Sequence, residues 1–267
     1  MKNMEKRKII DVHTHIFPEK IADKATEHLG KYYHYIIHGK GTFADLTKEA
    51  KQAGITKLVV FSTATKAEQV ENVNTFTAAH ISETIAGLGS LHPDYQPFEA
   101  EVARIKRLGL KGIKLHPDFQ QFNIDDPRMY PVYELLQAEK LPVLFHTGDE
   151  NFDYSSPKRL AKVMDDFPNL TVIAAHLGGY MRWEEACEYL IGRDVYIDTS
   201  SVYHRLSHEQ IVSIIRKHDI DRVLFGTDYP IDRYDYNFEH FDALGLTEDE
   251  QEKILYQNTQ QLFFHKT

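Results

Sequence analysis

The stretch LPVLFH, residues 141–146, is apolar almost throughout and ends in a histidine. A short apolar run of this kind is typical of a parallel β-strand that is covered on both faces. Seven further runs are short, apolar and rich in β-branched residues, and several of them are also apolar almost throughout: KIIDVH (8–13), TKLVVFST (56–63), TIAGLGSL (84–91), KGIKLH (111–116), LTVIAAH (170–176), DVYIDTS (194–200) and DRVLFGTD (221–228). The sequence therefore predicts eight strands.

Segments with helical spacing separate these strands. In FEAEVARIKRLG (98–109), Phe98, Val102 and Ile105 share one face, and Gly109 can end the helix. Similar spacing predicts helices in four other segments: 129–140, 156–167, 207–219 and 247–263. From the second strand onward, each next strand begins 24 to 30 residues after the one before it, which is close to the length of a βαβ repeat. Eight repeats of this length predict an α/β fold, a (β/α)8 TIM barrel.

An open, doubly wound sheet is the alternative arrangement of alternating strands and helices. That fold typically carries a glycine-rich phosphate-binding turn after an early strand, whereas the first strand here leads into DVHTHIFP (11–18). The chain also contains no low-complexity linker. We therefore predict a single barrel domain over residues 1–267.

Two connections between the predicted elements are long and rich in aromatic residues. Residues 17–42 contain KYYHYIIHGKG, and residues 229–246 contain YPIDRYDYNFEHF. Because the first and eighth strands of a closed barrel are neighbours, these loops should meet over the same sector of the mouth. They are a possible lid over a substrate, although packing of their aromatic rings on the barrel rim would also explain them.

Composition limits the possible partners of the protein. Lys and Arg total 31 against 40 for Asp and Glu, and the net charge of -9 argues against non-specific binding to nucleic acid or to an anionic membrane. The single cysteine, Cys187, excludes both an intramolecular disulfide and a cysteine-based metal cluster. We expect a cytoplasmic protein, a possible homo-oligomer, that acts on a small-molecule substrate.

The histidines have an uneven distribution along the chain. Of the 15, six lie in or just after a predicted strand, and most of those are at its C-terminal end: His13, His15, His92, His116, His146 and His176. The C-terminal ends of the strands form the catalytic face of a TIM barrel. The placement therefore favours a functional site, although His92, which precedes a proline, is better explained by a structural role.

His13 and His15 are the strongest candidates for metal ligands. Side chains two positions apart on a strand point to the same face, so both imidazoles should project together. Asp228 ends the eighth strand, which would close against the first, and His146 ends the fifth strand across the mouth. Three imidazoles and one carboxylate suit zinc or another borderline divalent ion and leave one position for water. His176 can face that water as a ligand, as an acid/base group, which we favour, or as a hydrogen-bond donor.

Five motifs, read in order, resemble the amidohydrolase superfamily: DVHTHIFP, GIKLHP, LFHTG, AAHLGG and FGTDYP. The resemblance is to its amidohydrolase-2 branch, which includes aminocarboxymuconate-semialdehyde decarboxylase and related acid decarboxylases, and it extends from residue 9 to about residue 230. It implies a metal-dependent hydrolase type of barrel in which His13, His15, His146 and Asp228 bind the metal. It also implies that His176 polarises water or protonates substrate and that Asp228 takes a proton from the water.

Lys114 and His116 lie on one face of the fourth predicted strand. In binuclear members of the superfamily that the chain resembles, a carboxylated lysine on this strand bridges two metals, so a second metal is expected only if Lys114 is carbamylated. Otherwise we expect one divalent ion, zinc in the first place, with manganese as the alternative. Lys114 and His116 are also candidate substrate contacts.

The candidate residues are compatible with three functions. The first is hydrolysis of an amide, a lactone or a similar carbonyl bond by a metal-activated water. The second is non-oxidative decarboxylation of an aromatic or unsaturated acid; decarboxylases of this branch tend to be longer, which favours hydrolysis. The third is a catalytically silent binding barrel. Arg182, Arg205 and Arg233 could each anchor a substrate carboxylate.

Overall fold

A computed structural model describes residues 7–264, and residues 1–6 and 265–267 lie outside the described part. All eight predicted strands are present; seven are shorter than the apolar run that predicted them, and the first has six residues, as its run does. They are β1 (Ile10–His15), β2 (Lys57–Phe61), β3 (Ile85–Leu88), β4 (Ile113–Leu115), β5 (Val143–Phe145), β6 (Val172–Ala174), β7 (Tyr196–Asp198) and β8 (Val223–Leu224). Just beyond these short strands, some backbone amides still donate to a neighbouring strand; the amide of His146, for example, donates to the carbonyl of Leu115 at 2.9 Å.

The described chain divides into two compact units, each built from separated stretches of sequence. The first comprises residues 7–60, 82–86 and 199–264, and the second comprises residues 61–81 and 87–198. Each unit holds its own set of predicted site residues. The expectation of one domain over the whole chain stays a prediction.

In the first unit, β1 is the central strand. It begins a sheet of order β1-β2-β3, and its other side meets the segment that follows β8. The amide of Val12 donates to the carbonyl of Phe225 at 2.9 Å, and that of His15 donates to Tyr229 at 2.8 Å. The predicted neighbourhood of the first and eighth strands is therefore confirmed.

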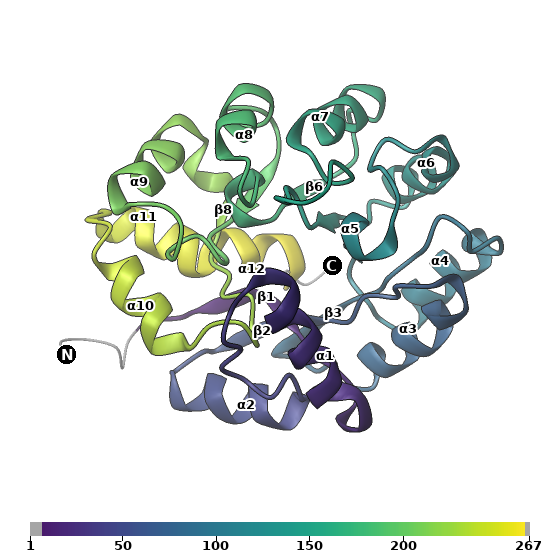
Figure 1. Cartoon of the computed structure of the whole chain (residues 1–267), viewed down its shortest axis with the longest axis horizontal. Coiled ribbons are helices and arrows are strands. Elements are labelled where there is room, and N and C mark those ends of the chain that lie inside the picture. Colours follow the sequence, from purple (N-terminus) through teal and green to yellow (C-terminus); the bar gives the residue numbers. More distant parts are fainter. Residues whose placement is uncertain (1–6, 265–267) are drawn as a thin grey trace. The chain divides into compact units, whose positions relative to one another are not determined.

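The last predicted helix contains a wider turn than expected. The segment 247–263 folds as α11 (Glu248–Glu252), a π-helical turn η6 (Lys253–Gln257) and α12 (Asn258–Phe263). A π turn leaves a carbonyl without its usual helical donor, and the carbonyl of Ile254 accepts from the amide of Phe225 at 3.0 Å. Figure 1 shows α12 beside β1, and contacts of α12 with β1 and β8 agree.

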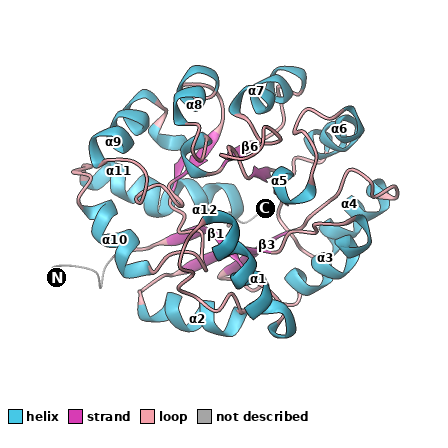
Figure 2. Cartoon of the chain, viewed as in Figure 1, coloured by secondary structure: helices cyan, strands magenta, loops and turns pink. Residues whose placement is uncertain are grey.

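The second unit contains four parallel strands in the order β4, β5, β6 and β7. Their registers pair Leu115 with Phe145 and Phe145 with Ala174, so neighbouring strands end at the same level. Helices cover them: α3 (Val70–Ala78), α4 (Phe98–Arg107), α6 (Tyr130–Ala138), α7 (Pro157–Asp166) and α8 (Trp183–Tyr189). Figure 2 shows these helices along the outer side of the unit. The aligned strand ends bring the side chains after β4, β5 and β6 to one edge.

The predicted helices at 98–109, 129–140, 156–167 and 207–219 are confirmed as α4, α6, α7 and α9 (His208–Lys217). Ser207 begins α9 with a capping box, in which its hydroxyl accepts from the amide of Gln210. The remaining helical elements are α2 (Phe43–Gln52), α5 (Pro117–Gln120) and the short turns η2 (Ala67–Gln69), η3 (Pro127–Met129), η4 (His176–Gly178) and η5 (Ile220–Arg222).

The two segments expected to be loops, 17–42 and 229–246, both contain a helix, which corrects that expectation. Helix α1 (Glu19–Tyr33) buries only three widely spaced residues, so its apolar pattern is weak. Helix α10 (Tyr234–Asp242) buries Tyr234, Phe238 and Phe241, a helical spacing that aromatic composition obscured. The expected meeting of the two segments is confirmed, because the amide of Gly39 donates to the carbonyl of Pro230 at 2.9 Å.

Within residues 7–264, none of the helices has both the length and the apolar character that crossing a membrane requires.

Candidate metal centre

The first unit brings three of the four predicted ligands together. His13 and His15 project from the same face of β1, while the hydroxyl of Thr14 between them donates to the carbonyl of Val59. The Nε2 atoms of both histidines lie 3.3 Å from the same carboxylate oxygen, Oδ1 of Asp228. His13 and Asp228 are buried and His15 is half-buried. We call these three residues the HHD group.

The spacing of the HHD group fits a divalent cation. Two ligand atoms bound to one tetrahedral ion at 2.0–2.2 Å lie about 3.4 Å apart, and the observed 3.3 Å separations are close to this value. Two imidazole nitrogens and a carboxylate oxygen are donors that zinc and manganese accept. Buried groups with this donor set and spacing can hold such an ion.

Asp228 reaches the group through an unusual backbone conformation. Its φ is 64°, in the left-handed region, and its amide donates to the carbonyl of His13 at 3.0 Å. A non-glycine residue in this region costs of order 1 kcal/mol and persists where the surroundings hold it, often at functional sites. His176 has the same feature, with a φ of 61°. Both residues predicted to be catalytic thus occupy strained positions just after a strand.

Two serines that no sequence motif indicated also contact the HHD group. The hydroxyl of Ser200 lies 3.1 Å from Nδ1 of His13, and the hydroxyl of Ser201 donates to Oδ2 of Asp228 at 2.6 Å. Both follow β7 and are buried. The predicted strand DVYIDTS (194–200) pointed to this strand end, but serine is too common in loops to be singled out.

Asp11 forms hydrogen bonds with His13 of the HHD group and with Thr227, the residue next to Asp228. It is fully buried, its Oδ1 accepts the amides of His13 and Thr227, both at 3.1 Å, and its Oδ2 accepts the hydroxyl of Thr227 at 2.6 Å. Burial raises the pKa of Asp11 to about 7, and these hydrogen bonds oppose the rise. Asp11 therefore connects β1 to the residue that precedes Asp228.

The second unit brings His146 and His176 together. His146 follows β5, His176 begins the turn η4 after β6, and both are buried. Nε2 of His176 lies 3.0 Å from Nδ1 of His146. This distance suits either a hydrogen bond between the rings or two ligands of one ion. The amide of His176 donates to the carboxylate of Asp198, and its carbonyl accepts from the indole of Trp183, so its backbone is held on both sides.

His116 lies beside the same pair. Its ring stacks on His146 at a centroid distance of 3.9 Å and on Phe119 at 4.0 Å. Asp118 is buried, accepts the hydroxyl of Ser155 at 2.6 Å and lies 4.0 Å from Nε2 of His146. Burial raises the pKa of Asp118 to about 7, opposed by the hydrogen bond from Ser155. His116 is thus placed to fix the ring plane of His146.

Lys114 and His92 occupy different surroundings in the same unit. Lys114 is fully buried, and its ammonium lies 5.1 Å from the centroid of the Phe61 ring. Nδ1 of His92 accepts the amide of Asp94 at 3.2 Å, and burial lowers the pKa of His92. This turn-forming bond agrees with a structural role for His92.

Comparison with known proteins identifies the family. The family model described as Amidohydrolase matches residues 10–264, nearly the whole chain. The chain belongs to this amidohydrolase family. The resemblance seen in the five sequence motifs is therefore confirmed over a longer span than those motifs covered.

Three solved structures show the fold that this amidohydrolase shares. One is an uncharacterised TIM-barrel protein from Bordetella bronchiseptica, with a TM-score of 0.77 and 22% identity over 96% of this chain and 98% of that chain. A dihydroxybenzoic acid decarboxylase from Polaromonas, with bound manganese, has a TM-score of 0.69 and 17% identity over 96% and 97%. A putative 2-pyrone-4,6-dicarboxylic acid hydrolase from Pseudomonas putida has a TM-score of 0.67 and 17% identity over 96% and 97%. The fold is the predicted (β/α)8 barrel.

The solved structures do not decide between hydrolysis and decarboxylation. The sequence favoured hydrolysis because decarboxylases of the branch were expected to be longer. The alignment spans 97% of the Polaromonas decarboxylase and the same share of the putative hydrolase. The two structures share this fold and carry different reactions in their names, so the fold alone favours neither reaction.

Gly148, in the loop after His146, packs closely against the backbone of Tyr180, in the segment after His176. Its φ is +85°, and a Cβ atom there would lie 2.6 Å from the amide nitrogen of Tyr180. We expect Gly148→Ala to reduce the free energy of unfolding by about 2–5 kcal/mol, because backbone strain and a steric clash add. Gly54→Ala is the matched control, since Gly54 has a φ of +78° and a Cβ atom there would meet no atom within 4 Å. Denaturant unfolding measures both variants; equal losses would contradict the clash.

The three candidate arginines of this family member have different neighbours. Arg182 forms ion pairs with Asp153 at 3.0 Å and Glu185 at 3.3 Å, and Arg233 pairs with Asp235. The guanidinium of Arg205 lies 5.0 Å from the centroid of the Tyr35 ring. A guanidinium stacked on an aromatic face keeps its N–H groups at its rim, where a carboxylate can reach them. Arg205 therefore differs from the other two in lying against an aromatic ring.

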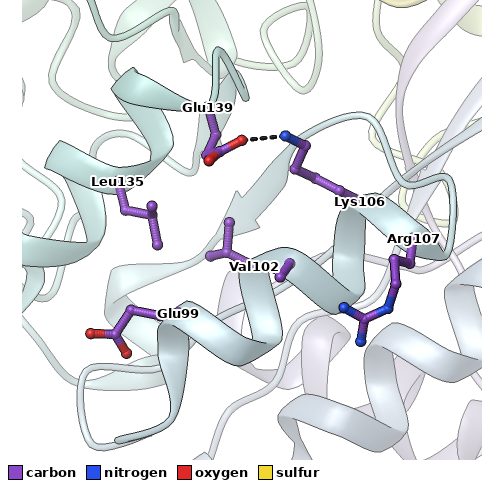
Figure 3. Close-up of a pocket in the computed structure, with 7 residues that line it drawn as sticks. Glu99, Val102, Lys106, Arg107, Leu135 and Glu139 are labelled. Atoms are coloured by element: carbon purple, nitrogen blue, oxygen red, sulfur yellow. Dashed lines mark hydrogen bonds and ion pairs between the residues drawn. The ribbon is translucent and has the colours of Figure 1, made fainter.

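A pocket of about 310 Å³ lies on the surface of the second unit, between α4 and α6 (Figure 3). Its walls carry both charge signs, and Lys106 and Glu139 pair with each other across it. Its lining residues are Glu99, Val102, Ala103, Lys106, Arg107, Leu135 and Glu139. They include none of the predicted site residues, so this pocket is not the candidate site.

Proposed function

We propose that the protein is a metal-dependent hydrolase that cleaves an amide, a lactone or a similar bond of a small carbonyl substrate. The observation that carries this proposal is the HHD group, in which two imidazoles share one carboxylate oxygen at 3.3 Å. The family description, Amidohydrolase, supports the same reaction class. The net charge of -9 supports a small molecule rather than a nucleic acid as the partner.

One divalent ion, zinc or manganese, is the proposed cofactor. His13, His15 and Asp228 would hold it, with His146 as the fourth ligand, because the C-terminal strand ends of a (β/α)8 barrel face one side. When bound, such an ion lowers the pKa of water toward about 7 and polarises a carbonyl group. Lys114 would take part in a second metal site only as a carbamate. We assign it and His116 to the substrate side of the proposed site.

Asp228 and His176 carry the proposed proton transfers. The carboxylate of Asp228 accepts a proton from the attacking water as its oxygen bonds to the carbonyl carbon. The bond from that carbon to nitrogen or oxygen then breaks, and the imidazole of His176 donates a proton to the leaving atom. In sum, water adds across the cleaved bond, and both residues return to their starting protonation states when the acquired proton passes on through solvent.

The segments 17–42 and 229–246 are proposed to cover the substrate. Besides their contact at Gly39, they approach His204: its ring lies 5.2 Å from that of Tyr35 and stacks on that of Tyr236 at 4.4 Å. Nε2 of His204 is 2.7 Å from the carboxylate of Asp232. Such an aromatic layer, with Arg205 stacked on Tyr35, suits a planar, anionic substrate.

Decarboxylation of an aromatic or unsaturated acid is the second candidate reaction. The similar fold of the manganese-containing Polaromonas decarboxylase supports it. In this reaction the HHD group would hold the same ion, which would supply the binding point for a substrate carboxylate or an adjacent hydroxyl, and His176 would protonate the carbon that loses carbon dioxide.

The decisive test is an assay of the metal-loaded protein on a panel of lactones, amides and aromatic acids. Carbon dioxide release is recorded separately from ring opening and amine release. We expect ring opening or amide cleavage that disappears in chelator and returns with zinc or manganese. Carbon dioxide release alone would select the second reaction. Turnover that persists in chelator with no metal bound would contradict both.

A further inference from the structure

We propose that Ser200 and Ser201 are positioning residues that fix the two ligands His13 and Asp228 in their metal-binding orientations. This inference rests on the proposed function, because it assumes that the HHD group binds a cation. The two neighbouring hydroxyls have different roles. Ser200 influences which nitrogen of the His13 imidazole carries the proton, and Ser201 holds the carboxylate of Asp228 in place.

The contact of Ser200 determines which nitrogen of His13 is available. Nε2 of His13 faces the carboxylate of Asp228, and Nδ1 lies 3.1 Å from the hydroxyl oxygen of Ser200. A neutral imidazole carries one proton, and the nitrogen that binds a metal must be the one without it. When Nδ1–H donates to Ser200, the lone pair of Nε2 points toward the HHD group. In this arrangement the hydroxyl oxygen of Ser200 accepts from Nδ1–H, and we infer that it stabilises the tautomer that can bind an ion.

Because Ser201 bonds to one carboxylate oxygen of Asp228, the other oxygen is left to face the two imidazoles. Oδ1 faces both imidazoles at 3.3 Å, while Oδ2 accepts the hydroxyl of Ser201 at 2.6 Å. A charge-assisted hydrogen bond of this length is strong and directional. It limits rotation of the carboxylate, so that Oδ1 stays directed at His13 and His15.

The backbone explains how adjacent serines reach different partners. Just before them, the amide of Thr199 donates to the carbonyl of Leu224 at 3.1 Å, which fixes this segment to β8. Ser201 then has a φ of 53°, in the left-handed region. This conformation is unfavourable for a serine, and an extended conformation would turn its side chain away from Asp228. Ser201 therefore combines an unfavourable backbone conformation with a strong hydrogen bond to Asp228.

The principal experiment measures the metal dissociation constant of Ser200→Ala and Ser201→Ala by competition with a chelator. Loss of a group that orients a metal ligand typically weakens binding 10–100-fold, and we expect a loss of about that size in each variant. Ser200→Thr keeps the hydroxyl, so it should restore most of the affinity. Long-range ¹H–¹⁵N spectra of the metal-free protein should show that the Nδ1–H tautomer of His13 becomes less populated in Ser200→Ala.

Ser90→Ala is the matched control, since Ser90 is a buried serine whose hydroxyl accepts the amide of Ala64 at 3.1 Å. It should reduce stability while keeping the metal affinity of the unsubstituted protein. Unchanged affinity and an unchanged tautomer in Ser200→Ala, together with unchanged affinity in Ser201→Ala, would overturn the positioning role. If the unsubstituted protein binds neither zinc nor manganese, the proposed function fails first, and the two failures are thus distinguishable.

Discussion

His15→Ala and Asp228→Ala should each abolish turnover and bring the bound metal to well below one ion per chain. His15 supplies one of two imidazoles, and Asp228 supplies the oxygen that both imidazoles approach at 3.3 Å. Because loss of an orienting group alone costs 10–100-fold in affinity, loss of a ligand should cost at least about 100-fold. Metal content by elemental analysis and kcat on the best substrate measure the two effects.

Folding must be checked separately in these variants. Asp228 also lies at a strained turn that donates to the carbonyl of His13, so Asp228→Asn, which keeps the side-chain shape, accompanies Asp228→Ala. His28→Ala is a matched control, because His28 is exposed on α1. Circular dichroism should be unchanged in all four proteins. A normal metal content in His15→Ala and Asp228→Asn would contradict the assignment of the HHD group.

His176→Ala should lose turnover by about 10²–10⁴-fold, the usual contribution of a general acid or base, and yet keep most of its metal. The imidazole is buried, and its Nε2 lies 3.0 Å from Nδ1 of His146. If that distance is a hydrogen bond, His176 donates or accepts a proton without binding the ion. Metal content and kcat together provide the measurement.

Loss of metal in His176→Ala would change the role assigned to His176. A loss of metal in His176→Ala as large as that in His15→Ala would make His176 a ligand, and the 3.0 Å distance would then join two ligand atoms of one ion. His92→Ala provides the comparison, since His92 caps a turn through Asp94 and should keep both metal and turnover.

The fold could be predicted from sequence because apolar runs and helical spacing are local signals. All eight strands lie inside their predicted runs or extend only slightly beyond them. The short ladder of β8, Val223–Leu224, could not be predicted, since the polar residues after it bond to Asp11 and His13, which are distant in sequence. The π turn at Ile254 depends in the same way on a distant partner, the amide of Phe225.

The site could be predicted in part, for a related reason. His13 and His15 are two positions apart on one strand, so their common direction follows from strand geometry alone. Asp228 required only the closure of the barrel. Ser200 and Ser201 could not be found this way, because their role arises from a left-handed turn and from two partners far away in the chain. Residue type carries little information for hydroxyls that act through another side chain.

The hydrogen bond from Phe225 to Ile254 links the C-terminal helical segment to the end of β8, close in sequence to Asp228. Phe225 is three residues before Asp228, so a nick by trypsin at Lys253 would loosen the acceptor that fixes the end of β8. We expect a stored sample clipped there to lose turnover although all the proposed metal ligands are still present. Mass spectrometry of aged preparations, rather than added zinc, would then identify the damage.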